Sequence, residues 1–124
     1  MTRTDADLNR LWDDFHAGVN MTSPELRDWL AMTDSGDAYS PNPDVDPREL
    51  GERVLNLLVK RKVDLSDQDV ADMQTATDAV RELLANPPDD DVANEPWRHS
   101  LMTLGHDPTR ADSPRGIDAE VALG

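Results

Sequence analysis

Residues 65–88 read LSDQDVADMQTATDAVRELLANPP, and this stretch decides the fold. Ser66 can cap a helix N-terminus, and Asp69, three residues later, can accept a hydrogen bond from the Ser66 amide. Two prolines end the pattern, because proline cannot continue a helix. Between these signals one face repeats at helical spacing, through Val70, Met73, Thr77, Val80 and Leu84. The stretch therefore predicts a long helix with one buried face.

Similar signals predict two helices before it, in the first 31 residues. The second of these begins with a capping box, in which Thr22 and Glu25 bond each other's backbone, and Met21 can pack on Leu26. The first ends near Gly18. Its apolar stripe consists of Leu8, Leu11, Trp12, Phe15 and Val19.

Two more helices complete the expected set. Asp46 caps a third helix, with Pro47 at its first position, and the pattern continues to about Lys62. A fifth, shorter helix begins after Asn94 and stops at Gly105. Residues 33–46 contain two prolines and no apolar periodicity, which predicts a loop.

These patterns predict an all-α protein, because no strand-like alternation occurs in the chain. We expect a single compact domain of about five helices over residues 5–108, and a disordered tail over residues 109–124. Four large side chains on apolar stripes are expected in the core, namely Trp12, Trp29, Leu57 and Trp97.

The chain is strongly acidic, with 26 Asp and Glu against 12 Lys and Arg and a net charge of −14. Asp outnumbers Glu by 20 to 6, and Arg outnumbers Lys by 10 to 2. We interpret this bias as adaptation to a salty cytosol, where the Debye length falls to about 3 Å and self-repulsion is screened. An acidic decoy or a cation-binding surface is the alternative. With no cysteine, no signal peptide and no apolar run long enough for a membrane span, we expect a cytoplasmic protein.

Few residues suggest catalysis or metal binding. His99 and His106 lie seven residues apart, and Asp107 follows; these are the residue types that a two-His-plus-carboxylate metal site uses. The structural alternative, that Asp107 is a capping or turn residue before Pro108, is favoured. The chain has no GxSxG nucleophile motif and no glycine-rich phosphate loop. We therefore expect no enzyme activity, no metal and no cofactor.

One basic segment interrupts the acidic chain. Residues 47–63 carry five basic and two acidic side chains, for a net charge of +3. Such a segment can contact the phosphates of nucleic acid, whereas the alternative is pairing with nearby Asp. The expected phosphate contacts are Arg53, Lys60, Arg61 and Lys62 on the third helix, joined by Arg98 and Arg110 if the fifth helix packs alongside.

Two blocks of sequence carry a family resemblance. They are residues 19–30, with VNMT, EL and WL, and residues 97–108, with WR, SLM and GHDP. The chain resembles, over about residues 8–110, an uncharacterised domain-of-unknown-function family of small proteins from salt-loving archaea, bacteria and fungi. Many members are labelled DNA-binding, so the resemblance implies a non-enzymatic, DNA-associated helical protein.

The fourth helix departs from that family, in which it is usually rich in basic residues. Here residues 74–82 read QTATDAVRE and contain a single basic residue, Arg81. This departure predicts a weak, salt-sensitive DNA binder or a divergent paralogue. The alternative is a protein–protein interaction or structural module without a nucleic-acid role, whose partner is another protein or a second copy of the chain.

Overall fold

The computed structural model describes residues 5–32, 44, 46–90 and 93–110. Within these ranges the chain forms five α-helices and one 3₁₀ turn and contains no strand, which confirms the all-α prediction. Most of the loop predicted for residues 33–46, and all of the tail predicted for residues 109–124 except residues 109 and 110, lie outside the described residues. The elements are α1 (Asp5–Gly18), α2 (Ser23–Ala31), α3 (Pro47–Leu58), η2 (Lys62–Asp64), α4 (Asp67–Ala85) and α5 (Glu95–Thr103).

The predicted helix starts are confirmed by their caps. Ser66 Oγ accepts from the Asp69 amide at 3.1 Å, and Asp69 Oδ2 accepts from the Ser66 amide at 3.0 Å. Thr22 and Glu25 form the same reciprocal box at 3.3 and 2.9 Å. Each box satisfies amide groups that a helix N-terminus would otherwise leave unpaired. Asp46 and Asn94 likewise cap α3 and α5, and Gly105 ends α5 with a φ of +88°.

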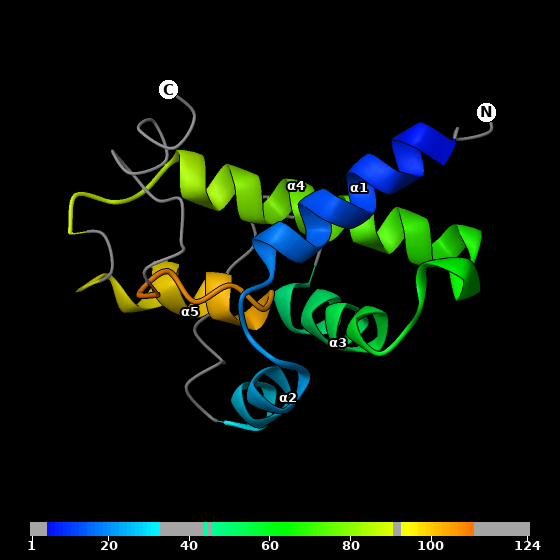
Figure 1. Ribbon diagram of the computed structural model, residues 1–124. Helices are drawn as coiled ribbons and strands as arrows, with labels where there is room; N and C mark the ends of the chain where they lie inside the picture. The colour runs from blue at the N-terminus through cyan, green and yellow to red at the C-terminus, as the bar shows by residue number, and fades with distance from the viewer. Residues whose placement is uncertain (1–4, 33–43, 45, 91–92, 111–124) are drawn as a thin grey trace.

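The helices are arranged in three tiers. Helix α1 lies across α4 at the top of Figure 1, α3 and α5 pack beneath α4, and α2 packs on α3 and α5 from below. Helix α4 contacts α1, α3 and α5, so the long helix predicted from residues 65–88 is the centre of the fold.

The tryptophans occupy two kinds of environment. Trp97 is fully buried, and its Nε1 donates to the Leu83 carbonyl at 2.9 Å. Trp29 is buried and donates to Thr103 Oγ1 at 3.0 Å, and Leu57 is buried as well. The core prediction is confirmed for these three side chains.

The same prediction is wrong for Trp12, which is only partly buried and packs against the edge of the core. Its ring centroid lies 4.2 Å from that of His16, and Lys62 Nζ lies 5.9 Å from the Trp12 ring centroid. A ring at the core edge leaves one face for a cation, and Lys62 lies over the Trp12 ring.

Helix α3 is shorter than predicted and ends at Leu58, not near Lys62. Val59 adopts φ −95° and ψ 0°, and the Lys60 amide donates to the Leu57 carbonyl, three residues back. The helix tightens and ends there, while the Lys60 side chain turns to the N-terminus of α4. Residues 60–62 therefore lie beyond the end of α3, in the connection to α4, and Lys62 begins the 3₁₀ turn η2.

Candidate functional site

The predicted DNA-contacting residues fall into two separate groups. Arg53, Lys60, Arg61 and Lys62 belong to α3 and the α3–α4 connection, at the right of Figure 1. Arg98 and Arg110 belong to α5 and the segment after it, at the left. Helix α5 does pack against α3, as the prediction required, but the two groups of cations lie on different segments of the chain.

Arg53 is held by two carboxylates. Its guanidinium bonds Glu49 at 3.0 Å within α3 and Asp72 on α4 at 2.9 Å. These hydrogen bonds, with that to Glu49 the larger influence, raise the pKa of Arg53. Arg53 thus acts as a clamp between α3 and α4, and its charge is balanced within the protein.

The α3–α4 connection has a regular pattern of exposure over residues 59–63, which we call the basic turn. Lys60 and Lys62 point back to the protein: Lys60 Nζ lies 2.7 Å from Asp69 Oδ2, and Lys62 Nζ lies 2.7 Å from Asn9 Oδ1. The residues between and beside them point outward. Val59 and Val63 are 70% and 82% exposed, and the Arg61 side chain is 79% exposed.

Arg61 is the outward cation of the basic turn, yet it is not isolated. Its Nε lies 2.8 Å from Asp64 Oδ2, three residues along the chain. An exposed pair of this kind contributes little stability, so the guanidinium can change partners at small cost.

The second group of cations supports the architecture. Arg110 bonds Glu25 at the start of α2 and, at 2.6 Å, the carbonyl of Asn20. Arg98 Nη2 lies 3.4 Å from His99 Nε2. Hydrogen bonds from Thr22, and then from Arg110, lower the pKa of Glu25.

The two sequence blocks that carry the family resemblance meet in space. Asn20 Oδ1 accepts from the Asp107 amide at 2.6 Å, and the Met21 amide donates to the Gly105 carbonyl at 3.0 Å. His106 is buried, with Nδ1 2.7 Å from the Gly18 carbonyl. Residues 106 and 107 thus hold the segment after α5 against the body of the protein.

The histidines form no metal centre in the described ranges, where no group of three or more His, Cys, Asp or Glu could hold an ion. His99 packs on Trp29, with ring centroids 4.9 Å apart, and it shares a shallow hollow with Asp107. Burial would raise the pKa of Asp107, but hydrogen bonds from Thr109 and the charge of Arg110 outweigh it and lower that pKa. His106 turns away from the hollow to the Gly18 carbonyl.

Asp69 is a buried carboxylate on α4 beside the basic turn, and it both takes part in the α4 capping box and bonds Lys60. The hydrogen bonds from Lys60 and Ser66 outweigh the effect of burial and lower the pKa of Asp69 below its ordinary value. A carboxyl group with a depressed folded pKa stabilises the fold above its unfolded pKa, about 3.9, and loses this contribution as pH falls through the folded pKa.

Replacing Asp69 by Asn should therefore lower the free energy of unfolding by about 1–3 kcal/mol at pH 7. Urea denaturation of both proteins between pH 7 and pH 2.5 measures the difference, which should narrow below about pH 4 as wild-type Asp69 takes up a proton. Asp64→Asn, which removes only the exposed partner of Arg61, serves as the control and should change little. If the difference in the free energy of unfolding between wild type and Asp69→Asn stayed constant over the whole pH range, this account would be contradicted.

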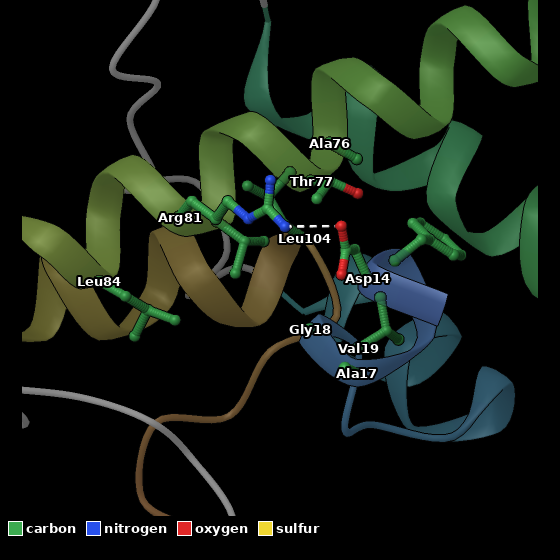
Figure 2. Close-up of a pocket in the computed structure, with 11 residues that line it drawn as sticks. Asp14, Ala17, Gly18, Val19, Ala76, Thr77, Arg81, Leu84 and Leu104 are labelled. Atoms are coloured by element: carbon green, nitrogen blue, oxygen red, sulfur yellow. Dashed lines mark ion pairs between the residues drawn. The ribbon is translucent and has the colours of Figure 1, made fainter. Parts of the chain in front are cut away.

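A pocket that sequence reasoning missed lies between α1 and α4 (Figure 2). Its volume is about 310 Å³, and its walls are mainly apolar, with contributions from Phe15, Val19, Val80 and Leu104. Arg81 and Asp14 form an ion pair of 2.8 Å beside it. The residue that could have indicated this pocket from the sequence is Thr77, because it places a hydroxyl group on the otherwise apolar face of α4.

Fold and site together define a small all-helical protein with an ordered, partly apolar turn and an apolar pocket. In the part of the chain that the structure describes, no helix has the length and apolar character needed to cross a membrane. Residues 14–102 match the model of a family described as "Protein of unknown function (DUF3140)", and the chain belongs to that family. Searches with this chain found no significant match among the curated proteins or among the solved structures.

Proposed function

We propose that this protein is a non-enzymatic interaction module of the cytosol that binds another protein through its basic turn. The observation that carries the proposal is the alternation over residues 59–63. Val59, Arg61 and Val63 point outward, whereas Lys60 and Lys62 are held by the protein itself. Exposed apolar side chains grouped around a polar one are typical of interaction surfaces.

The exposed apolar side chains of this protein are concentrated in the basic turn. Among the described residues, three large apolar side chains are strongly exposed, and two of them, Val59 and Val63, lie in this turn. The third, Met32, is 48% exposed and follows α2. Single exposed apolar residues are ordinary, but two that flank an exposed Arg make a contact surface.

The basic turn is also ordered before any partner arrives. The Asp64 amide donates to the Arg61 carbonyl at 3.0 Å, and the Leu65 amide donates to the Lys62 carbonyl at 3.3 Å. The bonds of Lys60 and Lys62 to α4 and α1 fix the turn from behind. A surface held in its bound conformation loses little entropy on binding, which favours affinity.

The chemistry of the turn fits a protein partner better than DNA. Two valines and one guanidinium match a surface that places a carboxylate between apolar side chains. Binding to the phosphate backbone needs several cations that are free to face outward together, and here two of the three lysine and arginine side chains of the turn are bonded to Asp69 and Asn9.

Site-specific photo-crosslinking in cells tests the proposal. A photoreactive side chain at position 59, 61 or 63 should give the same protein adduct, and the same group at exposed Arg27 or Ala85 should not. The adduct partner, purified, should bind the wild type and lose at least about tenfold in affinity to Arg61→Glu, since a like charge then faces its carboxylate. Adducts that do not depend on position, or an unchanged affinity of Arg61→Glu, would contradict the proposal.

Sequence-tolerant DNA binding is the second candidate, and one observation favours it. Residues 47–63 have a net charge of +3, and the Arg61 guanidinium is largely exposed within that segment. The family resemblance points the same way. This candidate requires Lys60 and Lys62 to leave Asp69 and Asn9 for phosphates.

The DNA candidate predicts a specific salt dependence. Changing Lys60, Arg61 and Lys62 together to Gln should reduce the magnitude of the log–log salt slope by about three units, while Arg98→Gln should remove about one if α5 contributes. Fluorescence anisotropy of a labelled duplex over a salt series measures both slopes, with folding checked by circular dichroism. The interaction module predicts no saturable duplex binding by the folded wild type, even at low salt.

A further inference from the structure

We propose that the pocket between α1 and α4 is a binding site for a small, neutral, mainly apolar molecule that carries one hydroxyl or carbonyl group. The site is separate from the basic turn and does not depend on the function proposed for that turn. Its volume of about 310 Å³ is roughly twice the 150 Å³ of a cavity known to hold benzene. A ligand of about ten to twelve heavy atoms, such as a bicyclic aromatic alcohol, fits this volume.

The hydroxyl of Thr77 identifies the polar group of the ligand. Thr77 lies on α4 on the side that faces α1, lines the pocket and is only 6% exposed (Figure 2). Its Oγ1 is fully buried, yet it has no hydrogen-bond partner among the described residues. Buried hydroxyl groups are nearly always bonded, so an unpartnered one in the wall of a pocket indicates a missing partner.

Three other hydroxyl groups on helices of this protein do have hydrogen-bond partners. Thr75 donates to the Ala71 carbonyl at 3.0 Å, Ser100 to the Pro96 carbonyl at 2.6 Å, and Thr103 to the His99 carbonyl at 2.8 Å. Each satisfies its hydroxyl on the carbonyl four residues earlier, as serine and threonine in helices commonly do. Thr77 does not, so its hydroxyl lacks a partner. Because this oxygen is fully buried, a hydrogen bond to a ligand carbonyl or hydroxyl requires the Thr77 side chain to turn toward the pocket.

The charges around the pocket favour a neutral ligand. Arg81 is already neutralised by Asp14, with Nη2 and Oδ2 2.8 Å apart, and both side chains reach solvent. An anionic ligand would have to displace or face the Asp14 carboxylate in a protein of net charge −14. The ligand therefore binds through its apolar body and one hydrogen bond, not through an ion pair.

Three probes of similar size test the site on the full chain. They are 2-naphthol, naphthalene, which lacks the hydroxyl, and 2-naphthoate, which carries a charge. Titration followed by protein NMR should show saturable binding of 2-naphthol at the α1–α4 pocket, about tenfold tighter than naphthalene because of the bond to Thr77. Binding of 2-naphthoate should be weaker than that of 2-naphthol. No saturable binding of 2-naphthol, or tighter binding of the carboxylate, would overturn the proposal.

Two variants separate the ligand site from a packing defect. Thr77→Val keeps the shape, and it should raise Tm without ligand by about 4 °C because it removes the unpartnered hydroxyl. The Thr77→Val variant should also bind 2-naphthol about tenfold more weakly, while its affinity for naphthalene should be unchanged. Ala17 is exposed and lines the pocket, so Ala17→Leu should lower the affinity for both 2-naphthol and naphthalene. The control Ala85→Leu, on the exposed end of α4, should change neither affinity. An unchanged 2-naphthol affinity in both Thr77→Val and Ala17→Leu would refute the site.

Discussion

Replacing Trp97 by Ala is expected to lower the free energy of unfolding by about 3–5 kcal/mol. The side chain is fully buried at the start of α5, and its loss removes a large apolar contact and leaves a cavity. It also removes the donor to the Leu83 carbonyl, 2.9 Å away near the end of α4. Because single domains have only about 5–15 kcal/mol of stability, this loss is a large fraction of the free energy of unfolding. Urea denaturation followed by circular dichroism measures the loss.

Trp12→Ala is the matched comparison for Trp97→Ala. Trp12 is half-buried at the core edge, and its ring meets His16 and Lys62 there. Trp12→Ala should therefore lower the free energy of unfolding clearly less than Trp97→Ala, since the Trp12 side chain buries less apolar surface. Equal losses at the two positions would show that the assignment of the core centre to α4 and α5 is wrong.

Replacing Gly51 by Ala is expected to destabilise the protein by about 3 kcal/mol, at the upper end of the usual cost of overpacking. A Cβ at this position on α3 would lie 2.3 Å from the backbone oxygen of Thr103 and 3.0 Å from Leu30 Cδ2. The first neighbour is backbone, so relief requires α3 and α5 to move apart. Thermal unfolding of the variant should show a large drop in Tm.

Gly18→Ala provides the control for Gly51→Ala. A Cβ at residue 18 would meet Val80 Cγ1 at 3.7 Å, which is ordinary contact. The substitution also restricts the unfolded chain, so it should be neutral or stabilise by about 0.4–1 kcal/mol. If Gly51→Ala behaved like Gly18→Ala, the close approach of α3 and α5 would be refuted.

The sequence was informative where local chemistry determines local structure. Ser66 with Asp69, and Thr22 with Glu25, are capping pairs that need only three residues of spacing, and both form as expected. The apolar stripes likewise placed Trp29 and Trp97 in the core. These features depend on neighbours along the chain, which the sequence gives directly.

Features that depend on neighbours in space were not predictable. Helix α3 ends at Leu58 and not near Lys62, and beyond that end Lys60 bonds Asp69 of α4. The apolar spacing within α3 does not reveal this contact between two segments. The alternation of exposed and anchored residues in the basic turn follows from the same contact and from the bond of Lys62 to Asn9. The α1–α4 pocket and the close approach at Gly51 also arise only when helices pack.

The central claim is that the basic turn binds protein, and the chemical nature of the adduct at position 61 tests it most directly. A photoreactive side chain there, activated in cells, reacts with whichever macromolecule lies against Val59 and Val63. The account predicts an adduct that proteases remove and nucleases leave intact. An adduct that nucleases remove, or the absence of any adduct from a folded and expressed protein, would contradict it.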